Sequence, residues 1–354
     1  MSTRLSPLDH ERLIARRGAR SGLLCIVAVH STAAGFACGG MRILGYEDRW
    51  QGVDDALRLS RGMTYKCAAA GLAHGGGKGV IALAPGEPLE GERRIAALHD
   101  FGDLVESLDG AYGTSADVGS SAEDMVHVRE RTRHAYSLPA RHGGGGEPSA
   151  PTAAGLERAL DATCRARFAS DDVGGRTVAV LGLGQVGGRI ARRLAARGAA
   201  LTVSDVDPAK QALAAELGAT WVDPDTALTA DVDVLVPCAL GGVLNEDSVP
   251  RLRCRAIVGA ANNQLAHDGV ADLVHARGIL WAPDFVANAG GVIYAVTVDV
   301  DGGSWHDPGA HLDVIGENLD AIFTRAAAEG TTPLHEAMAL AEARIAGHGA
   351  GAGR

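Results

Sequence analysis

Short apolar runs alternate along this chain with longer segments whose apolar residues recur every three or four positions. The apolar runs are candidates for strands, and the segments between them have the periodicity of amphipathic helices. In the first part of the chain, strands are predicted at residues 23–30, 33–40, 79–83 and 111–118, and helices at residues 52–70, 92–108 and 122–131. Strands and helices that alternate in this order predict an α/β fold.

A second alternating series begins after residues 142–151, a segment with four consecutive glycines and two prolines. Such a segment cannot form a regular element, so we place a domain boundary and a hinge there. Beyond it we predict a helix at residues 152–168, strands at residues 176–183, 232–236, 256–260 and 279–282, and a long helical segment at residues 313–345.

The strand that opens this second series leads into a dinucleotide-binding fingerprint. Gly182, Gly184 and Gly187 form a GxGxxG pattern before an amphipathic helix, and the next strand ends at Asp205, 23 residues after Gly182. The glycines permit a tight turn and let a pyrophosphate approach the helix N-terminus, while the carboxylate accepts the ribose hydroxyls. Because an acid at this position would repel a 2′-phosphate, NAD is expected rather than NADP.

Polar or glycine-containing segments follow the later strands, and in a parallel sheet they would gather at the carboxyl edge, where ligands bind. Asn262 and Asn288 lie in such segments and could bond a carboxamide or an amino group, although either could cap a helix instead. The remaining predicted cofactor contacts lie in the glycine turn and after two later strands: Gln185, Val186, Cys238, Ala239 and Ala260.

We therefore predict two α/β domains with the active site in a cleft between them. Residues 1–142 and about 325–354 would form a substrate-binding, catalytic domain, and residues 143–324 a Rossmann-type NAD-binding domain. The tail, residues 347–354, is expected to lack structure.

Composition and charge narrow the possible functions. The 354 residues are 46% apolar without an apolar segment of membrane-spanning length, which predicts a soluble protein. A net charge of −10 without a basic patch argues against nucleic-acid binding. Six cysteines without CxxC spacing predict thiols in a reducing cytoplasm, and the 13 histidines show no metal-ligand spacing, so no metal is expected.

Lysine is rare in this chain, with three lysines against thirty arginines. Two of the three, Lys66 and Lys78, flank a glycine-rich stretch that we predict to be a turn. Arginine keeps its proton in proteins, whereas a desolvated lysine can lose one and act as a general base. We predict that Lys78 transfers protons and that Lys66 binds an anionic group. The alternative is a pair of surface lysines beside a flexible loop.

These lysines, together with Asp117, suit the oxidative deamination of an amino acid. Lys66 would pair with the α-carboxylate, and Asp117 would exchange protons with the amino group. Lys78, its pKa lowered by burial and by Lys66, would take a proton from the water that attacks the imine. Hydride would pass to NAD, and a 2-oxo acid and ammonia would leave. Asp117 could instead be an acid at the N-terminus of a helix.

In combination, the motifs resemble the amino-acid dehydrogenases of the leucine, phenylalanine, valine and glutamate superfamily over roughly residues 20–330. The motifs that carry the resemblance, mainly to the leucine and phenylalanine branch, are RGMTYKCAAAGL, GGGKGVI, TSADVGSSAEDM, GLGQVGG, PCALGGVL, GAANNQL and APDFVANAGGVI. The resemblance implies the same roles for Lys66, Lys78 and Asp117, and a homo-oligomer, a dimer or larger, that assembles through the first domain.

The resemblance also implies further site residues. Gly39 and Gly40 match a pair that borders the substrate, Asn262 matches an asparagine near nicotinamide and substrate, and Thr152 matches a cofactor-contacting threonine. The side chains expected around the substrate are Cys38, Met63, Ser115, Val292 and Ala295.

These residues narrow the substrate to an apolar L-amino acid, either branched-chain or aromatic. Glutamate enzymes place a lysine just before the Gly-Gly pair, whereas this chain has Cys38 there. An acidic side chain in this pocket would therefore lack a partner, which is costly. Ala295 is small and leaves room for a bulky or aromatic group.

Two other functions remain open at this point. One is a dehydrogenase that tailors an unusual aromatic amino acid, such as tryptophan, in secondary metabolism. The other is a silent NAD-binding paralogue, which the joint presence of Lys66, Lys78 and Asp117 disfavours. His74 replaces an apolar residue of the relatives; it could perturb Lys78, contact substrate, or be a half-buried histidine with satisfied hydrogen bonds.

Overall fold

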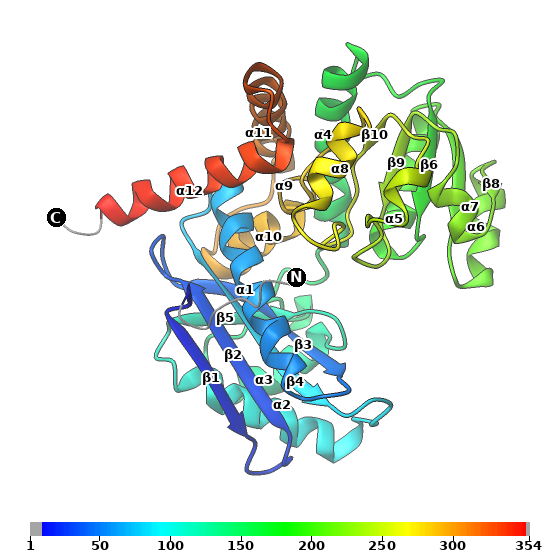
Figure 1. Ribbon diagram of the computed structural model, residues 1–354. Helices are drawn as coiled ribbons and strands as arrows, with labels where there is room; N and C mark the ends of the chain where they lie inside the picture. Colours follow the sequence, from blue (N-terminus) through cyan, green and yellow to red (C-terminus); the bar gives the residue numbers. More distant parts are fainter. Residues whose placement is uncertain (1–8, 352–354) are drawn as a thin grey trace. The chain divides into compact units, whose positions relative to one another are not determined.

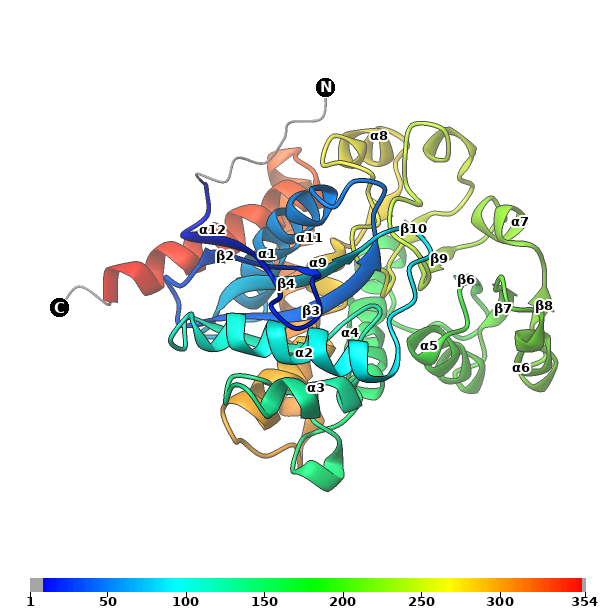
Figure 2. The same ribbon diagram turned by 90° about the horizontal axis from the view of Figure 1, so that it is seen from below.

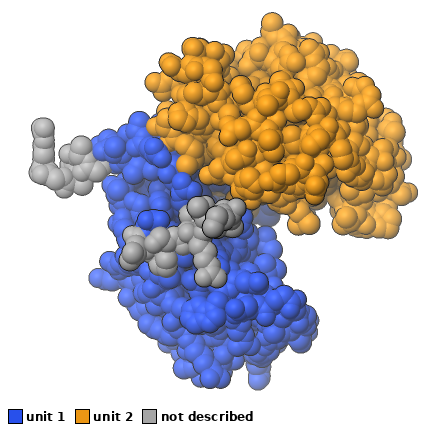
Figure 3. Space-filling view, in the orientation of Figure 1, with its two compact units in different colours: residues 1–147, 294–305, 341–354 blue, residues 148–293, 306–340 orange. Residues whose placement is uncertain are grey.

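The structure, a computed structural model, describes residues 9–351 and divides the chain into two compact units, coloured separately in Figure 3. Unit 1 comprises residues 1–147, 294–305 and 341–354, and unit 2 comprises residues 148–293 and 306–340. The first break lies inside the glycine- and proline-rich segment. The chain returns to unit 1 in two pieces, in place of the single segment expected from about residue 325. No helix among residues 9–351 is long and apolar enough to cross a membrane.

Unit 1 is built on a five-stranded mixed sheet in the order β1-β2-β4-β3-β5 (Figure 1). β2 is antiparallel to β1 and β4, whereas β3 is parallel to β4 and β5. The elements of this unit are β1 (Arg12–Arg17), β2 (Leu24–Ser31), β3 (Ala37–Gly45), α1 (Gln51–Ala69), β4 (Gly75–Leu83), α2 (Gly91–Glu106), β5 (Tyr112–Ala116) and α3 (Ala122–Arg129). The sequence analysis missed β1, since an arginine-rich edge strand with a mostly exposed surface lacks an apolar run.

The two faces of this sheet carry different helices, which Figure 2 shows on opposite sides of the strands. α1 covers one face, where Ile26, Ala28 and Val80 are buried beneath it. α2 and α3 pack beside each other on the other face, over a larger core that includes Phe101 and Tyr112. The period-two alternation of each strand therefore decides which of its side chains face α1.

The glycine run before Lys78 is strand rather than turn, which corrects the expectation from the sequence. Gly75, Gly76 and Gly77 are buried in β4. A Cβ on Gly76 would lie 2.0 Å from the backbone nitrogen of Thr64 in α1, and one on Gly77 would lie 2.5 Å from the Tyr112 ring. The glycines thus allow close packing on both faces of the sheet. Lys78 consequently projects from a buried strand, not from a flexible loop.

Unit 2 contains a six-stranded, fully parallel sheet in the order β11-β10-β9-β6-β7-β8. This is the doubly wound order of dinucleotide-binding domains, which confirms the predicted α/β fold class. Its elements are α4 (Ser149–Phe168), β6 (Thr177–Leu181), α5 (Gln185–Ala196), β7 (Ala200–Ser204), α6 (Gln211–Glu216), β8 (Thr220–Trp221), α7 (Pro224–Leu228), β9 (Val234–Pro237), β10 (Ala256–Ile257), α8 (Val270–Ala276), β11 (Leu280–Trp281), α9 (Asp284–Ala287) and α11 (Pro308–Glu329).

Two of the four points at which the chain passes between the units lie within helices, α10 (Gly290–Ala295) and α12 (Pro333–Gly351). A π-helical segment, Val296–Val300, follows α10. The helix predicted at residues 313–345 is in fact two helices, because Gly330 ends α11 at a φ of +66° and α12 starts afresh at Pro333.

The end of α12 belongs to unit 1 and packs on α1. The Arg344 guanidinium donates to the carbonyl oxygens of Ala68 (3.1 Å) and Ala69 (2.6 Å) at the end of α1. The tail expected to lack structure is helical up to Gly351, and residues 352–354 lie outside the described residues.

Candidate functional site

Lys78 and Asp117 form a buried ion pair in unit 1. The Lys78 Nζ donates to Asp117 Oδ2 over 2.8 Å, and the side chains are 6% and 22% exposed. Lys78 lies in the middle of β4, whereas Asp117 follows the last residue of β5. Between these strands lies β3, so the two residues meet across the sheet although they are 39 positions apart.

Strand register explains which predicted residues gather near this pair. Cys38 and Gly40 in β3 align with Gly113 and Ser115 in β5, and Arg42 aligns with Val80 in β4. Since Val80 faces α1, the alternate positions 38, 40 and 42 in β3, 78 in β4 and 115 in β5 share that face. Three of the residues predicted to surround the substrate therefore lie on the sheet face that carries Lys78.

Burial and charge set the protonation of the pair. Burial lowers the pKa of Lys78, and the positive charge of Arg42 acts in the same direction against the raising effect of Asp117. Burial alone would raise the pKa of Asp117, but Lys78 and Arg42 outweigh it and hold that pKa at about 2. Asp117 is thus ionised at neutral pH in the protein without substrate, and Lys78 gives up its proton more readily than an ordinary lysine, which suits a general base.

Arg42, which was not assigned a role from the sequence, contacts the Lys78–Asp117 pair. Its Nε donates to Asp117 Oδ2 (3.2 Å) and its Nη1 to Asp55 Oδ2 (2.9 Å), an oxygen that also accepts from the Tyr46 hydroxyl (2.8 Å). Besides the contribution expected from Lys66, the positive charge of Arg42 lowers the pKa of Lys78. Its position in the sequence, directly after the Gly-Gly-Met segment of β3, could have indicated that Arg42 lies near the Gly-Gly pair.

Asp117 does not cap α3, contrary to the alternative weighed from the sequence. Ser121 is the N-cap residue, and it forms a capping box with Asp124. The Asp117 backbone N–H donates to Ser120 Oγ (2.9 Å), and that hydroxyl donates to the Met41 carbonyl (2.7 Å). These bonds fix the turn after β5, so that the carboxylate is left to Lys78 and Arg42.

Gly39 and Gly40 occupy positions in β3 where a side chain would not fit. A Cβ on Gly39 would lie 1.8 Å from the Gly77 carbonyl oxygen, and one on Gly40 would lie 2.8 Å from Asp117 Cβ. Gly40 therefore leaves room for the Asp117 side chain.

Lys66 and Met63 lie on α1 and are half-buried. Lys66 stands in the last turn of this helix, two positions beyond Thr64, whose backbone lies against Gly76 of β4. α1 crosses β4 where Thr64 lies against Gly76. Lys66 comes two residues after Thr64 in α1, and Lys78 comes two residues after Gly76 in β4.

Beside Cys38 lies a group of rings at the start of β3 and β4. Cys38 is 6% exposed, and burial raises the pKa of its thiol well above the usual value, so the group is neutral. The Phe36 ring lies 4.7 Å from His74 in an edge contact and 6.2 Å from Tyr136 in a stacked one. A Cβ on Gly113, the register partner of Cys38, would lie 2.7 Å from Tyr136 and 2.8 Å from Phe36.

His74 is buried rather than half-buried. Its Nε2 pairs with Asp301 Oδ1 at 3.1 Å, while its Nδ1 is buried without a hydrogen-bond partner among the described residues. It is therefore not the fully satisfied histidine that was one alternative from the sequence.

The three fingerprint glycines of unit 2 each have a different physical role. Gly182 turns the chain at a φ of +94°, and a Cβ on Gly187 would lie 1.9 Å from the Gly182 carbonyl oxygen. A Cβ added to Gly184 would have no neighbouring atom within 4 Å. Gly184 is also the N-cap residue of α5, so no side chain bonds to the first N–H groups of this helix. The first turn of α5 thus presents backbone N–H groups at an open surface, which suits a pyrophosphate. Gln185 and Val186 lie in this turn.

Asp205 follows β7 and lies against the glycine turn. Its Oδ2 accepts from the Leu183 backbone N–H (2.6 Å), and its Oδ1 accepts from the Asp207 N–H (2.9 Å). Two large apolar side chains at the carboxyl edge of the sheet, Val206 and Leu240, are 89% and 84% exposed. A flat ring bound at this edge would cover apolar surface that is otherwise in water.

The second group of predicted cofactor residues also meets in unit 2. Asn288, 6% exposed, donates to the Ala260 carbonyl (3.1 Å) and to Asn262 Oδ1 (2.9 Å). Its own Oδ1 is buried without a hydrogen-bond partner among the described residues. An acceptor of this kind fits the amide N–H of a carboxamide. Cys238 and Ala239 follow β9, at the same edge of the sheet.

The remaining predicted residues are placed but not linked to these groups. Thr152 lies in α4, where its hydroxyl donates to the Pro148 carbonyl (2.8 Å) and its Oγ1 would meet a Cβ on Gly291 at 2.5 Å. Val292 belongs to unit 2 and Ala295 to unit 1, and both are half-buried in α10.

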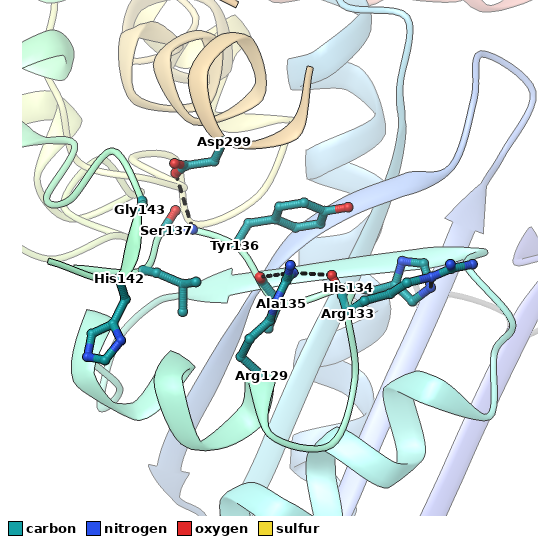
Figure 4. Close-up of a pocket in the computed structure, with 11 residues that line it drawn as sticks. Arg129, Arg133, His134, Ala135, Tyr136, Ser137, His142, Gly143 and Asp299 are labelled. Carbon is teal, nitrogen blue, oxygen red and sulfur yellow. Dashed lines mark hydrogen bonds between the residues drawn. The ribbon is translucent and has the colours of Figure 1, made fainter. Parts of the chain in front are cut away.

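A separate pocket of about 410 Å³ lies in unit 1 around residues 129–144 and Asp299 (Figure 4). The Arg129 guanidinium donates to the carbonyl oxygens of Arg133 and Ala135, and Asp299 accepts from the backbone N–H of Ser137 (3.2 Å). These charged groups hold the chain in place. The pocket contains none of the predicted site residues, so we do not assign the active site to it.

Comparison with known proteins agrees with this geometry. Residues 12–134 match the family described as the dimerisation domain of Glu/Leu/Phe/Val dehydrogenases, and residues 209–346 match Glutamate/Leucine/Phenylalanine/Valine dehydrogenase. A leucine dehydrogenase from Bacillus subtilis is 39% identical over 95% of this chain and 92% of its own length. The chain belongs to the Glu/Leu/Phe/Val dehydrogenase family.

Within this family, the similar proteins include enzymes for apolar amino acids. A phenylalanine dehydrogenase from Lysinibacillus sphaericus is 42% identical over 80% of this chain and 75% of its own length. The solved structure of L-tryptophan dehydrogenase from Nostoc punctiforme has a TM-score of 0.81 at 36% identity and covers 96% of this chain and 97% of its own. A glutamate dehydrogenase from Thermus thermophilus, 23% identical with a TM-score of 0.80 over 100% of this chain and 93% of its own, shows the shared fold.

The Glu/Leu/Phe/Val dehydrogenase assignment also accounts for the dinucleotide fingerprint. Residues 154–244 match the NAD-binding domain of D-isomer specific 2-hydroxyacid dehydrogenases. The protein is thus an amino-acid dehydrogenase with a nicotinamide cofactor, and the α/β fold and the family predicted from the sequence are confirmed.

Proposed function

We propose that the protein catalyses the reversible, NAD-dependent oxidative deamination of an apolar L-amino acid to the 2-oxo acid and ammonia. The observation that carries the proposal is the buried Lys78–Asp117 pair of unit 1, in a chain whose unit 2 has a complete dinucleotide fingerprint. Membership of the Glu/Leu/Phe/Val dehydrogenase family supports the reaction, and the leucine, phenylalanine and valine dehydrogenases among the relatives support the substrate class.

The residues present in unit 2 fit a dinucleotide. The N–H groups at the start of α5 would hold the pyrophosphate, Asp205 the ribose hydroxyls, and the Asn288 acceptor the carboxamide. Thr152, Cys238 and Ala239 remain proposed contacts. When bound, NAD would accept the hydride that leaves the α-carbon of the substrate.

In unit 1, the proposal assigns one role to each charged side chain. Lys66 pairs with the substrate α-carboxylate, and Asp117 accepts a proton from the substrate ammonium group, so that the amine can be oxidised to an imine. Lys78 takes a proton from the water that adds to the imine carbon, and the tetrahedral adduct loses ammonia to give the 2-oxo acid. Burial and the charge of Arg42 lower the pKa of Lys78, which favours its action as this base. Hydride transfer requires that the dinucleotide of unit 2 reach this site.

The choice of substrate rests on the sheet face that carries Lys78. Cys38 is a buried neutral thiol, and the Gly-Gly pair beside it adds no charge. An acidic substrate side chain near Cys38 would be desolvated without a partner. Gly39, Gly40, Met63, Ser115, Val292 and Ala295 remain proposed substrate contacts.

NAD preference is the finer part of the cofactor proposal, and Asp205 tests it. Asp205→Ser should lower kcat/KM for NAD and raise the relative use of NADP by about tenfold or more, because the repulsion of a 2′-phosphate is lost. The measurement is kcat/KM with each cofactor at saturating amino acid. Asp207→Ser, which removes a neighbouring carboxylate outside the predicted set, is the matched control. An unchanged NADP-to-NAD ratio in Asp205→Ser would contradict the ribose role.

A second candidate, a dehydrogenase selective for aromatic amino acids such as tryptophan, is favoured by the ring cluster beside Cys38. Phe36, His74 and Tyr136 place aromatic edges and faces at the end of the sheet where the substrate side chain is proposed to lie. Aromatic groups pack favourably against one another in offset and edge-on arrangements. The similarity to the L-tryptophan dehydrogenase of Nostoc punctiforme points in the same direction.

His74→Leu should separate the two substrate classes. Removing the imidazole from the ring cluster is expected to lower kcat/KM for phenylalanine and tryptophan relative to leucine by about 3- to 30-fold, an effect of one packing contact. The values of kcat/KM for the aromatic amino acids and for leucine are measured on the same protein preparation, from the absorbance of NADH at 340 nm. A ratio within twofold of the unaltered protein would show that the cluster does not select the substrate.

The reaction itself is tested with NAD and a panel of the twenty amino acids in the same assay. Turnover of leucine, valine, phenylalanine or tryptophan is expected, with little for glutamate. NAD binding without turnover of any amino acid would instead indicate the silent paralogue.

A homo-oligomer and a cytoplasmic location complete the proposal. The match to a dimerisation domain at residues 12–134 supports self-association, a dimer or larger. All six cysteines are free thiols, which suits a reducing compartment.

A further inference from the structure

Two histidines and one glutamate meet on the surface of unit 1, away from the residues assigned to deamination. His99 lies in α2, His127 in the last turn of α3, and Glu130 is the residue that ends α3. One ligand atom from each lies within 4.8 Å of the others. No metal was expected from the sequence because no typical ligand spacing occurs in it, whereas His99 and Glu130 are 31 positions apart.

The separations between these atoms suit a small divalent ion. His127 Nδ1 lies 3.5 Å from Glu130 Oε1, and His99 Nε2 lies 2.7 Å from Glu130 Oε2. Two ligands on a tetrahedral zinc ion, each about 2.0–2.1 Å from the metal, are about 3.3 Å apart. The first separation is close to that value, and the second must open by less than about 1 Å. The two histidine nitrogens lie within 4.8 Å of each other and would have to approach to a similar distance through side-chain rotation.

His127 provides the observation that distinguishes this cluster from an ordinary surface hydrogen bond. Its Nδ1 is shielded from solvent, and the nearest acceptor, Glu130 Oε1, lies 3.5 Å away, which is long for a hydrogen bond. A buried polar atom with only a long contact is poorly satisfied. An ion between Nδ1 and Oε1 would satisfy this atom.

We propose that His99, His127 and Glu130 form a binding site for a divalent transition-metal ion of the Zn²⁺ type, which links α2 to α3. Two imidazole nitrogens and one carboxylate oxygen are the ligands that zinc prefers, and three protein ligands leave a coordination position for water. The side chains are 24%, 36% and 51% exposed, so an ion can enter from solvent.

The site would stabilise the helix that follows the catalytic aspartate. α3 begins directly after its N-cap Ser121, which follows the turn that contains Asp117 and Ser120. At the other end of α3, Arg129 already ties the helix to the carbonyl oxygens of Arg133 and Ala135. An ion that joins His127 and Glu130 to α2 would hold this end of α3 against the core of unit 1.

The test is isothermal titration of ZnSO4 into the untagged, full-length protein after treatment with a chelator. We expect one Zn²⁺ per chain and a rise in the thermal unfolding midpoint of at least about 2 °C at saturation, because the ion binds only the folded state. Co²⁺ in place of Zn²⁺ should give the visible absorption of a four-coordinate ion.

Three variants assign the ligands. His99→Asn, His127→Asn and Glu130→Gln should each weaken Zn²⁺ binding by at least about 100-fold and abolish the thermal shift. His335→Asn, which alters an exposed histidine of α12, should leave both unchanged. Unaltered circular dichroism and amino-acid turnover without metal would show that the variants fold. Absence of stoichiometric binding, or binding that the three variants do not weaken, would overturn the proposal.

Discussion

Replacing Lys78 with methionine should lower kcat for amino-acid deamination by about 100- to 10,000-fold, the range that a general base contributes, while NAD binding is retained. Methionine fills a similar volume in the buried strand but cannot carry a proton, so the packing of β4 is kept. Asp117 would still have Arg42 as its ionic partner at 3.2 Å, which limits the structural consequence of the change. Stopped-flow and steady-state formation of NADH would measure kcat, and fluorescence titration would measure NAD affinity.

The matched control is Lys210→Met, which changes the only lysine outside the stretch that holds Lys66 and Lys78. It should leave kcat within about twofold, because Lys210 lies in unit 2 and has none of the proposed catalytic roles. If Lys78→Met kept more than a tenth of the original kcat, Lys78 would not be the base. A fall in kcat together with a loss of NAD binding and of folded signal would indicate a structural role instead.

Asp117→Asn should lower kcat by about 100-fold or more and move the pH dependence of the residual activity to lower pH. In the structure, the Asp117 carboxylate raises the pKa of Lys78, whereas burial and the charge of Arg42 lower it. When the negative charge is removed, only the lowering influences remain, and Lys78 loses its proton at a lower pH. The rising limb of kcat/KM with pH should therefore shift to the acid side.

The sign of this shift makes the prediction specific. Asp55→Asn removes the other carboxylate bonded to Arg42 but leaves the 2.8 Å contact between Lys78 and Asp117. It should have a smaller effect on kcat and a smaller displacement of the same limb. A shift of the Asp117→Asn limb to higher pH, or no shift, would mean that the base is not the lysine that Asp117 contacts.

The same pair makes a small contribution to stability that depends on pH. The pKa of Asp117, about 2 in the folded protein, is lower than that of an aspartate in an unfolded chain, about 3.9. The stabilisation is therefore fully present above about pH 4 and is lost as the pH falls towards 2. The deamination assay near neutral pH lies outside this window, so the loss of this stabilisation does not affect the unaltered protein there.

The dinucleotide fingerprint could be predicted from the sequence because its geometry depends only on residues close together in the chain. The roles of Gly182, Gly184 and Gly187 depend on a strand, a turn and a helix that follow one another within a few residues. The structure shows the tight turn, the open position and the close contact that this spacing predicted. The scarcity of lysine likewise singled out Lys78 before any strand was placed.

The elements that were predicted wrongly or missed depend instead on contacts with residues far away in the sequence. The glycines before Lys78 were taken for a turn, because a glycine that leaves room for α1 and Tyr112 cannot be told from one that bends the chain until its neighbours are known. The β1 strand was missed because its place at the sheet edge, not its arginine-rich composition, makes it a strand.

By itself, the sequence determined the family, the α/β class and the identity of the charged residues at the proposed site. Only the tertiary structure decided how those charges are paired. Arg42 reaches Asp117 across 75 positions of chain because parallel register places β3 beside β5, and a pairing of that kind has no signature in the spacing of residues. The cluster of His99, His127 and Glu130 arises in the same way, from two helices that meet only when both pack on one face of the sheet.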